Sequence, residues 1–213
     1  ARPVAVQSVL LSTLGVLLTA GLTGLFIHLV LRLSWLESLL IGSVIASTDA
    51  ASVFNILRSR SLNLKFNTAS LLELESGSND PMSYMLTVVL VTLMTGGDIS
   101  VPLVLAKQLV FGILFGVCIG IAASFLLRRS HAAMAQGDTI FVFAAALIAY
   151  ALPSMLGGDG YLSVYLCGIL MGNAPIAQKR DLVRFFDAIT GITQIMIFFL
   201  LGLLVTPAQL PRV

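Results

Sequence analysis

Charged residues are scarce in this sequence, and their scarcity excludes most soluble folds. Only 10% of the 213 residues are Asp, Glu, Lys or Arg, whereas a soluble domain carries about 25%. The hydrophobic share is 58% and the mean hydropathy is +1.01, so we predict an integral membrane protein. The formal net charge of +2 comes without a clustered basic face, and we therefore expect no nucleic-acid partner.

Cysteine and histidine are nearly absent. The two cysteines, Cys118 and Cys167, lie inside apolar runs and have no cysteine or histidine at ligand spacing. This pattern excludes a disulfide framework and the usual structural zinc motifs. We expect neither a cofactor nor an enzymatic activity.

What the sequence has in abundance is long apolar runs. They lie at 4–31, 36–57, 68–95, 102–127, 138–156, 160–173 and 182–206. We expect all seven to be helices, because an open sheet edge in lipid leaves backbone groups without hydrogen bonds. The sixth run is too short to span a bilayer upright, and it follows the turn-forming residues 157–160, so the fifth and sixth runs are predicted to form a tight hairpin. The fold class is therefore all-α, a polytopic transmembrane helical bundle.

The basic residues sort by side if every run crosses the membrane. One side receives Arg2, Arg58, Arg60, Lys65, Arg128, Arg129, Lys179, Arg180 and Arg184, and the other receives Arg32, Lys107 and Arg212. Because cytoplasmic loops are rich in Lys and Arg, the first side is predicted to be cytoplasmic. It includes residue 1 and the loops 58–67, 128–137 and 174–184. The chain starts without a methionine and ends directly after an apolar run, and we expect it to be part of a longer membrane protein.

Glycines recur at four-residue spacing in the fourth run. Gly112, Gly116 and Gly120 share one helix face, which allows a neighbouring helix to approach closely. The spacing alone leaves open whether that neighbour belongs to the same chain or to a second copy.

Four acidic residues lie at predicted membrane depth, where ionisable groups are costly and are functional candidates. They are Asp49, Glu73, Glu75 and Asp80. Asp49 follows Ser47 and Thr48, whose hydroxyls compete with the helical hydrogen bonds. A broken helix near Asp49 would present free carbonyls and helix ends to an ion. The alternative is an intact helix with small residues for tight packing and one water-exposed aspartate.

The third run carries two polar faces. Glu73, Ser76 and Asp80 share one face, and Glu75 and Asn79 share another. Pro81 cannot donate a hydrogen bond to the Gly77 carbonyl, so a kink is predicted there. Oxygens from this face, with Thr48 and Asp49 opposite, would suit a monovalent cation, or they would form a structural hydrogen-bond cluster.

A carboxylate at membrane depth can bind either a proton or a metal ion, because desolvation raises its pKa toward neutrality. Asp80 is therefore a candidate for a group at which a proton and a cation compete. Such competition is sufficient for antiport if the carrier crosses the membrane only when the group is occupied.

The motifs Ser47-Thr48-Asp49 and Glu75-Ser76-Gly77-Ser78-Asn79-Asp80 resemble those of monovalent cation/proton antiporters. The resemblance is to the cation-proton antiporter one branch, and most of all to its bacterial potassium/proton antiporters. It runs along the whole chain and implies a secondary antiporter that exchanges K⁺, or next Na⁺, for H⁺.

The resemblance also implies roles for single residues. Asp80 corresponds to the shared carrier of cation and proton. Thr48 and Asp49 help to coordinate the ion, and the family serine corresponds to Ser76. Asn79 stabilises the site.

Glu75 and Glu73 complete the predicted site as stabilising residues. The family partner of Glu75 is an arginine from a later helix, and this chain has no such arginine. The family fold has about thirteen helices with two inverted repeats, of which this chain matches roughly the fourth to the tenth.

The same resemblance predicts that 1–97 holds the ion-binding core helices and that 98–213 holds the scaffold and dimerisation helices. A homodimer in the bacterial inner membrane is expected. Ala50 and Gly77 depart from common family residues, which bears on ion selectivity and helix stiffness. The single Asp of the Asn-Asp pair implies electroneutral exchange.

Other functional classes also fit parts of the pattern. A cation channel could use a broken helix, although no filter-like run of carbonyl ligands is present. A non-transporting membrane scaffold would need none of the acids. An intramembrane aspartyl protease also needs two aspartates on neighbouring membrane helices. Such enzymes carry a Tyr-Asp motif on one helix and a Gly-x-Gly-Asp motif on the next, and neither motif is present at Asp49 or Asp80.

Overall fold

The computed structural model of the chain describes residues 4–48, 64–65, 68–96, 100–129, 135–176 and 179–204. Every regular element in these ranges is a helix, as the sequence predicts. The elements are α1 (Ala5–Leu10), α2 (Val16–Leu31), α3 (Trp35–Ile45), α5 (Thr68–Met94), α6 (Val101–Arg129), α7 (Ala135–Met155), α8 (Gly160–Asn173) and α9 (Lys179–Leu204). A π-helical turn, Leu11–Gly15, joins α1 to α2.

Four helical stretches in the described part of the chain are long and apolar enough to cross a bilayer. They are Val6–Leu31, Val101–Arg129, Gly137–Met155 and Lys179–Leu204. The α5 helix has 27 residues and is therefore about 40 Å long. Its first half carries the predicted acids, so it is less apolar than these four stretches. The 14 residues of α8 confirm that the sixth run is short. The second run was predicted to extend to residue 57, and its described helix ends at Ile45.

A tight hairpin joins α2 to α3. Arg32 ends α2 in the left-handed region at φ 54°, and Ser34 begins α3 with a capping box in which its side chain and that of Glu37 bond each other's backbone N–H. The two helices then pack without a spacer at Gly42, where a Cβ atom would lie 2.4 Å from the Ala20 carbonyl oxygen. Glycine is therefore required at Gly42 for this crossing.

The glycine face of α6 is covered by α8 of the same chain. A Cβ atom on Gly112 would lie 2.9 Å from the Asp159 carbonyl oxygen, and one on Gly116 would lie 2.6 Å from that of Ser163. Gly120 meets the backbone of Cys167 in the same way, at 3.1 Å. The predicted close helix neighbour is confirmed, and it lies within the chain, so this face is not free for a second copy.

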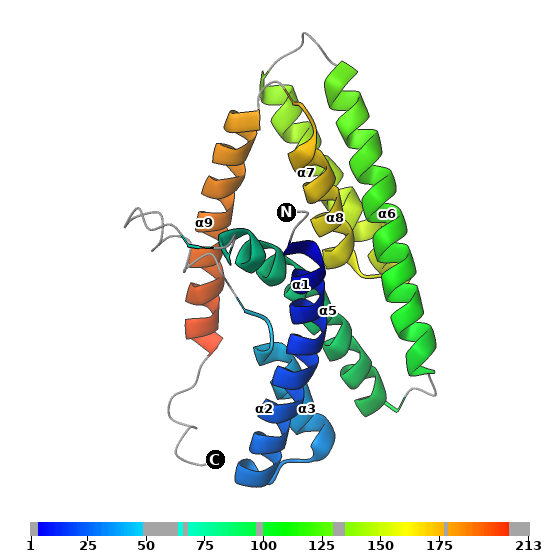
Figure 1. Cartoon of the computed structure of the whole chain (residues 1–213), viewed down its shortest axis with the longest axis vertical. Helices are drawn as coiled ribbons and strands as arrows, with labels where there is room; N and C mark the ends of the chain where they lie inside the picture. Colours follow the sequence, from blue (N-terminus) through cyan, green and yellow to red (C-terminus); the bar gives the residue numbers. More distant parts are fainter. Residues whose placement is uncertain are drawn as a thin grey trace.

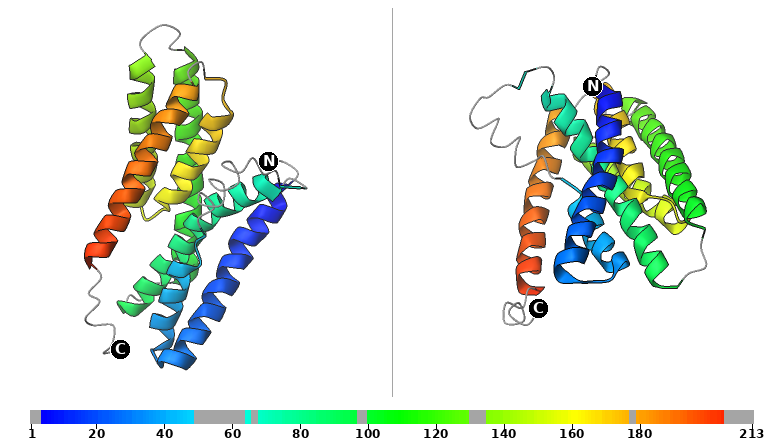
Figure 2. Two further views of the ribbon diagram at one scale, coloured as in Figure 1. Left: turned by 90° about the vertical axis from the view of Figure 1, so that its left-hand side faces the viewer. Right: turned by 60° about the horizontal axis from the view of Figure 1, so that its bottom comes forward.

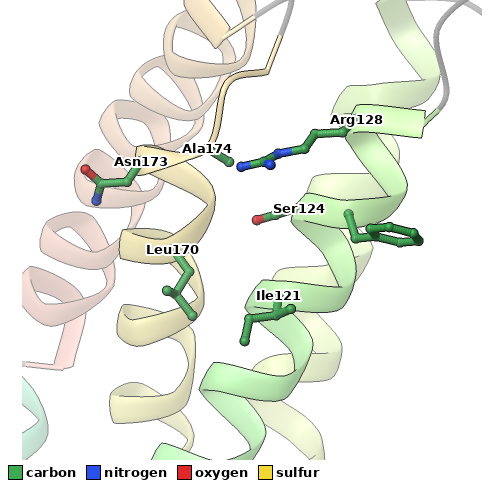
Figure 3. Close-up of a pocket in the computed structure, with 7 residues that line it drawn as sticks. Ile121, Ser124, Arg128, Leu170, Asn173 and Ala174 are labelled. Carbon is green, nitrogen blue, oxygen red and sulfur yellow. The ribbon is translucent and has the colours of Figure 1, made fainter.

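Arg128 lies at the far end of the contact between α6 and α8. A cavity of about 290 Å³ is lined there by Ser124, Arg128 and Asn173, among others. Figure 3 shows the Arg128 side chain extending from α6 toward Ala174, the residue that ends α8. A cation in this place offsets the partial negative charge at the C-terminal end of a helix.

The helices form two groups that α5 links (Figure 1). One group contains α1, α2 and α3, with Val16, Ala20 and Ala46 buried between them and α5. The other contains α6, α7 and α8, with a core of Ala123, Leu127, Ala145, Ala149, Cys167 and Met171. The apolar helix α9 stands apart and mainly touches α7.

The α5 helix bends along its length (Figure 2). Pro81 lies inside α5 and is buried, and an internal proline removes one backbone hydrogen bond and kinks a helix. The predicted kink is thus present. It places the first half of α5 across the end of α3, which is the location of the predicted site.

Candidate functional site

The candidate site forms where the chain leaves α3 and meets α5. The α3 helix ends at Ile45, and the N–H of Ala46 makes the last helical bond, to Gly42. Ser47 and Thr48 follow outside the helix. The helix end near the predicted break is therefore present, whereas Asp49 and the residues up to 63 lie outside the described residues.

Three hydrogen bonds connect these two residues to α5. The Ser47 hydroxyl donates to Oδ1 of Asp80. The Ser76 hydroxyl donates to the Thr48 carbonyl oxygen at 2.7 Å, and Nδ2 of Asn79 donates to Oγ1 of Thr48 at 2.5 Å. The structure thus brings together Thr48, Ser76, Asn79 and Asp80 from the predicted set.

Asn79 lies beneath this cluster and connects it to Glu75. The Asn79 side chain is completely buried, and its Nδ2 also donates to Oε1 of Glu75 at 3.2 Å. This bond confirms the second polar face that the i, i+4 spacing predicts. Oδ1 of Asn79 has no hydrogen-bond partner among the described residues.

Among the predicted site residues that the structure describes, Glu73 is the one that lies outside the cluster. Its side chain is exposed on the first turns of α5, and it takes part in none of the hydrogen bonds that join the other described residues of the cluster. Asp80 is exposed as well, but it is held by Ser47. The two carboxylates on one face of α5 therefore differ in their surroundings.

A second set of hydrogen bonds holds the end of α3 against α5. The Ser83 hydroxyl donates to the Ser43 carbonyl oxygen at 2.5 Å, and the hydroxyls of Ser43 and Thr87 lie 3.0 Å apart. These bonds lie one to two turns beyond Asp80 on α5. They fix the position at which α3 ends and so the position of Ser47 and Thr48.

Tyr165 of α8 is a neighbour of the site that sequence reasoning missed. Its hydroxyl accepts from the Ser78 hydroxyl at 3.2 Å and donates to the Leu74 carbonyl oxygen at 3.3 Å. A Cβ atom on Gly77 would lie 2.6 Å from the Tyr165 ring. Gly77 was expected to loosen the helix, and the structure shows in addition that its missing side chain makes room for this ring.

Ser47 was also underestimated from the sequence. It belongs to the Ser47-Thr48-Asp49 motif, but its hydroxyl was expected only to compete with local helical bonds. The motif itself was the available signal. No signal in the sequence links Tyr165 to Ser78, because the two residues are 87 positions apart.

The cluster offers oxygen atoms of three kinds. They are the Asp80 carboxylate, the hydroxyls of Ser47 and Ser76, and the Thr48 carbonyl. Hard cations prefer such oxygens, and a carboxylate can take up a proton instead. Asp80 is thus the member of the cluster that combines an ionisable group with neighbouring neutral oxygen atoms.

Comparison with known proteins assigns the chain to a family. The profile of the family described as "Sodium/hydrogen exchanger, transmembrane" matches residues 2–212. The chain belongs to this family. It is 42% identical over 204 residues to the K⁺/H⁺ antiporter NhaP of Alkalimonas amylolytica. The aligned region covers 94% of the chain and 35% of the relative.

Other members of the sodium/hydrogen exchanger family are similar over the same region. Identity to the K⁺/H⁺ antiporter NhaP2 of Shewanella oneidensis is 39% over 208 residues, or 94% of the chain and 35% of the relative. The Na⁺/H⁺ antiporter NhaS2 of Synechocystis is 26% identical over 204 residues, or 92% of the chain and 37% of the relative. The chain thus spans about a third of the length of these relatives, all of which are named as antiporters.

Proposed function

We propose that this chain forms the ion-binding part of a secondary antiporter that exchanges a monovalent cation for protons at Asp80. The observation that carries the proposal is the hydrogen bond from Ser47, beyond the end of α3, to the Asp80 carboxylate on the kinked helix α5. A helix end and a kinked helix meet at one carboxylate. This is the kind of discontinuous backbone at which transporters bind their ions.

Each residue of the cluster has a distinct part in this proposal. Asp80 exchanges a cation for a proton, and Thr48, Asp49 and Ser76 supply further oxygens. Asn79 joins Thr48 to Glu75 and so stabilises the site, and Glu73 is a further stabilising acid. Because one carboxylate takes one proton or one monovalent ion, the exchange is electroneutral.

Potassium is the favoured cation and sodium the next. The support comes from the names of the relatives at 38–42% identity, which are K⁺/H⁺ antiporters. The remaining two thirds of the length of such a protein would supply further helices around Asp80, which is exposed in this chain.

The placement in the membrane is part of the same proposal. The C-terminal end of α6 and the N-terminal end of α9 lie at one end of the molecule (Figure 1), and they carry Arg128, Arg129, Lys179 and Arg180. This end would face the cytoplasm of a bacterial cell, in the inner membrane. Residues 1–97 would form the ion-binding core and 98–213 the scaffold of a homodimer.

The test of this proposal uses the full-length protein in vesicles with a preformed pH gradient. Added K⁺ or Na⁺ is expected to collapse the gradient, and Asp80→Asn is expected to abolish the response because it removes the carboxylate at which the cation and the proton compete. Asp181→Asn is the matched control, since it makes the same chemical change at an exposed i, i+3 pair with Arg184 that contributes little.

Each outcome bears on one part of the proposal. A response in Asp181→Asn but not in Asp80→Asn supports exchange at Asp80, and the cation with the lower KM is the preferred substrate. Equal responses in all three proteins remove Asp80 as the carrier. No response to any cation in any of them favours the channel or scaffold alternatives.

A further inference from the structure

A second buried carboxyl group lies in the connection between α7 and α8. Asp159 begins α8 as its N-cap, and its Oδ1 accepts a hydrogen bond from the Leu162 N–H at 3.1 Å. Its side chain is 0% exposed, and its second oxygen, Oδ2, has no hydrogen-bond partner among the described residues. A buried acceptor without a donor is costly, so capping alone does not account for this carboxyl.

Gln108 of α6 contacts Asp159, and it also has a buried side-chain oxygen without a hydrogen-bond partner among the described residues. The Asp159 N–H donates to the Gln108 carbonyl oxygen at 3.1 Å. The Gln108 side chain is 3% exposed, and its Oε1 also lacks a partner within the described ranges. Each of the two oxygens is therefore a buried acceptor that no donor among the described residues reaches. A proton on Oδ2 of Asp159 would turn that acceptor into a donor.

A cavity of about 740 Å³ opens beside these two residues. It is lined by residues of α5, α6 and the connection after α7, including Tyr84, Lys107, Gln108, Gly157 and Gly158. Gln108 and Gly158 both line it, so the cavity reaches the immediate neighbours of Asp159, while Asp159 itself is buried.

On α5 the cavity is lined by Tyr84 and Val88, which follow Asp80 in the sequence. Tyr84 follows Asp80 by four residues, which is about 6 Å along one helix face. The Tyr84 ring packs on Tyr161 with centroids 4.8 Å apart, and Tyr161 packs on Tyr150 at 5.3 Å. Tyr161 lies in the first turn of α8, directly after the N-cap Asp159 and Gly160.

Asp159 is recessed from the end of the molecule. Its carbonyl oxygen lies against Gly112, the twelfth residue of α6, which is about 16 Å along that helix. The carboxyl thus lies between the Asp80 face of α5 and the end of the molecule at which α6 begins, on the side opposite to Arg128 and Arg129.

Asp159 is surrounded by titratable side chains from four helices. Burial raises the pKa of Asp159 to about 6, against the lowering effect of its hydrogen bonds to the backbone of Leu162 and Tyr161. The facing groups are Tyr84 of α5, Lys107 of α6, Tyr150 of α7 and Tyr161 of α8.

We propose that Asp159, next to Gln108, is a second proton-binding site, through which protons pass between Asp80 and this cavity. The proposal depends on the antiport function proposed above. In the acid form, the O–H at Oδ2 is the missing donor. Release of H⁺ to cavity water leaves the carboxylate, and uptake of a proton released from Asp80 restores the acid, so no bond other than O–H is made or broken.

Two substitutions separate proton binding from helix capping. Asparagine caps a helix as well as aspartate does, so Asp159→Asn keeps the bond to Leu162 and removes the titrating group. Asp159→Ala removes both. Ser154→Ala is the control, because Ser154 lines the same cavity and does not titrate.

The first measurement is the thermal midpoint of the purified full-length protein between pH 4 and pH 8. An acid with a raised pKa in the folded state stabilises below the unfolded pKa of about 4, and the contribution is lost as the pH rises through about 6. The midpoint of the wild-type protein relative to that of Asp159→Asn is therefore expected to fall over this range. A constant difference means that Asp159 binds no proton there and overturns the proposal.

The second measurement is the exchange rate in oriented vesicles as the pH on the cavity side is varied. Asp159→Asn is expected to lower the rate by roughly tenfold or more on the side of the profile below pH 7, as for loss of a positioned proton-transfer group. Ser154→Ala should keep the wild-type profile. A wild-type profile in Asp159→Asn, with loss of rate only in Asp159→Ala, makes Asp159 a helix cap and overturns the relay.

The two arms also separate this proposal from the proposed function. The thermal measurement does not require transport. If the wild-type protein shows no exchange but its midpoint responds to Asp159→Asn as expected, antiport fails and proton binding at Asp159 stands. If exchange is normal and the midpoint difference between the wild-type protein and Asp159→Asn is constant, antiport stands and proton binding at Asp159 fails.

Discussion

At the scale of single residues, the site depends on two serines that hold the ends of two elements together. Ser47 donates to the Asp80 carboxylate, and Ser76 donates to the Thr48 carbonyl. A hydroxyl that donates to a carboxylate favours its charged form. Ser47 is therefore expected to favour the state of Asp80 that binds a cation over the state that binds a proton.

Replacement of Ser47 tests this role. We expect Ser47→Ala in the full-length protein to raise the KM for the cation by about tenfold, because a hydrogen bond to a charged group contributes ~1.5 kcal/mol or more. The pH at which exchange is half-maximal should rise, since Asp80 holds its proton more firmly. The measurement is cation-dependent exchange at several pH values. Ser78→Ala is the control, because Ser78 bonds Tyr165 on another face of α5, and equal effects of both changes would contradict this role of Ser47.

At the scale of helices, close packing between α6 and α8 depends on glycine. The Gly116 position meets the backbone of Ser163, with a Cβ atom 2.6 Å from its carbonyl oxygen and 2.9 Å from its Cα. Backbone atoms cannot turn aside as a side chain does. Any side chain at Gly116 must therefore separate the two helices.

Gly168 provides a matched control for this packing. Gly168 lies inside α8, and Gly116 lies inside α6. A Cβ atom at Gly168 would meet nothing within 4 Å. We expect Gly116→Ala to destabilise the protein by about 1–3 kcal/mol, as overpacking does, and Gly168→Ala to change stability by less than about 0.5 kcal/mol. Thermal midpoints of the two purified variants check this. Equal midpoints would mean that the helices separate without cost.

The helices were more predictable from the sequence than their contacts were. The third run, 68–95, is helical from Thr68 to Met94, because charges and breakers bound it on both sides. The glycine spacing predicted a close neighbour for α6 but did not identify α8. The π-helical turn at Leu11–Gly15 had no signal, since apolar residues surround it evenly.

The site shows the same division between local and distant information. The bond between Asn79 and Glu75 follows from their spacing on one helix. The bond from Ser47 to Asp80 joins residues 33 positions apart, and it depends on where α3 ends. The packing of Tyr165 on Gly77 depends on the placement of α8, which the spacing of residues within a helix does not determine.

At the scale of the whole molecule, the two groups of helices meet at α5. The first half of α5 contacts α1 and the end of α3, while its residues Gly77, Ser78 and Leu74 contact Tyr165 of α8. Among the described helices, α5, which carries Asp80, is therefore the one that makes the main contacts with both groups. Movement of one group against the other would alter the surroundings of Asp80, which is what alternating access requires.

The orientation of the molecule gives a prediction at this scale. Ser100, directly before α6, lies at the end of the molecule predicted to face outward, and Asp181, in the first turn of α9, lies at the basic end. In a full-length protein whose cysteines are replaced by serine, we expect Ser100→Cys to react with an impermeant maleimide in intact cells. Asp181→Cys should react only in inside-out vesicles.

The physical reason is that Lys and Arg are retained on the cytoplasmic side during insertion, and the basic residues of this chain are predicted to divide nine to three between the two sides. Gly191→Cys, near the middle of α9, is the control and should react from neither side, because lipid excludes the reagent. Reaction of Asp181→Cys in intact cells would reverse the orientation. The Asp159 cavity would then open to the cytoplasm, and protons released from Asp80 through it would leave on that side.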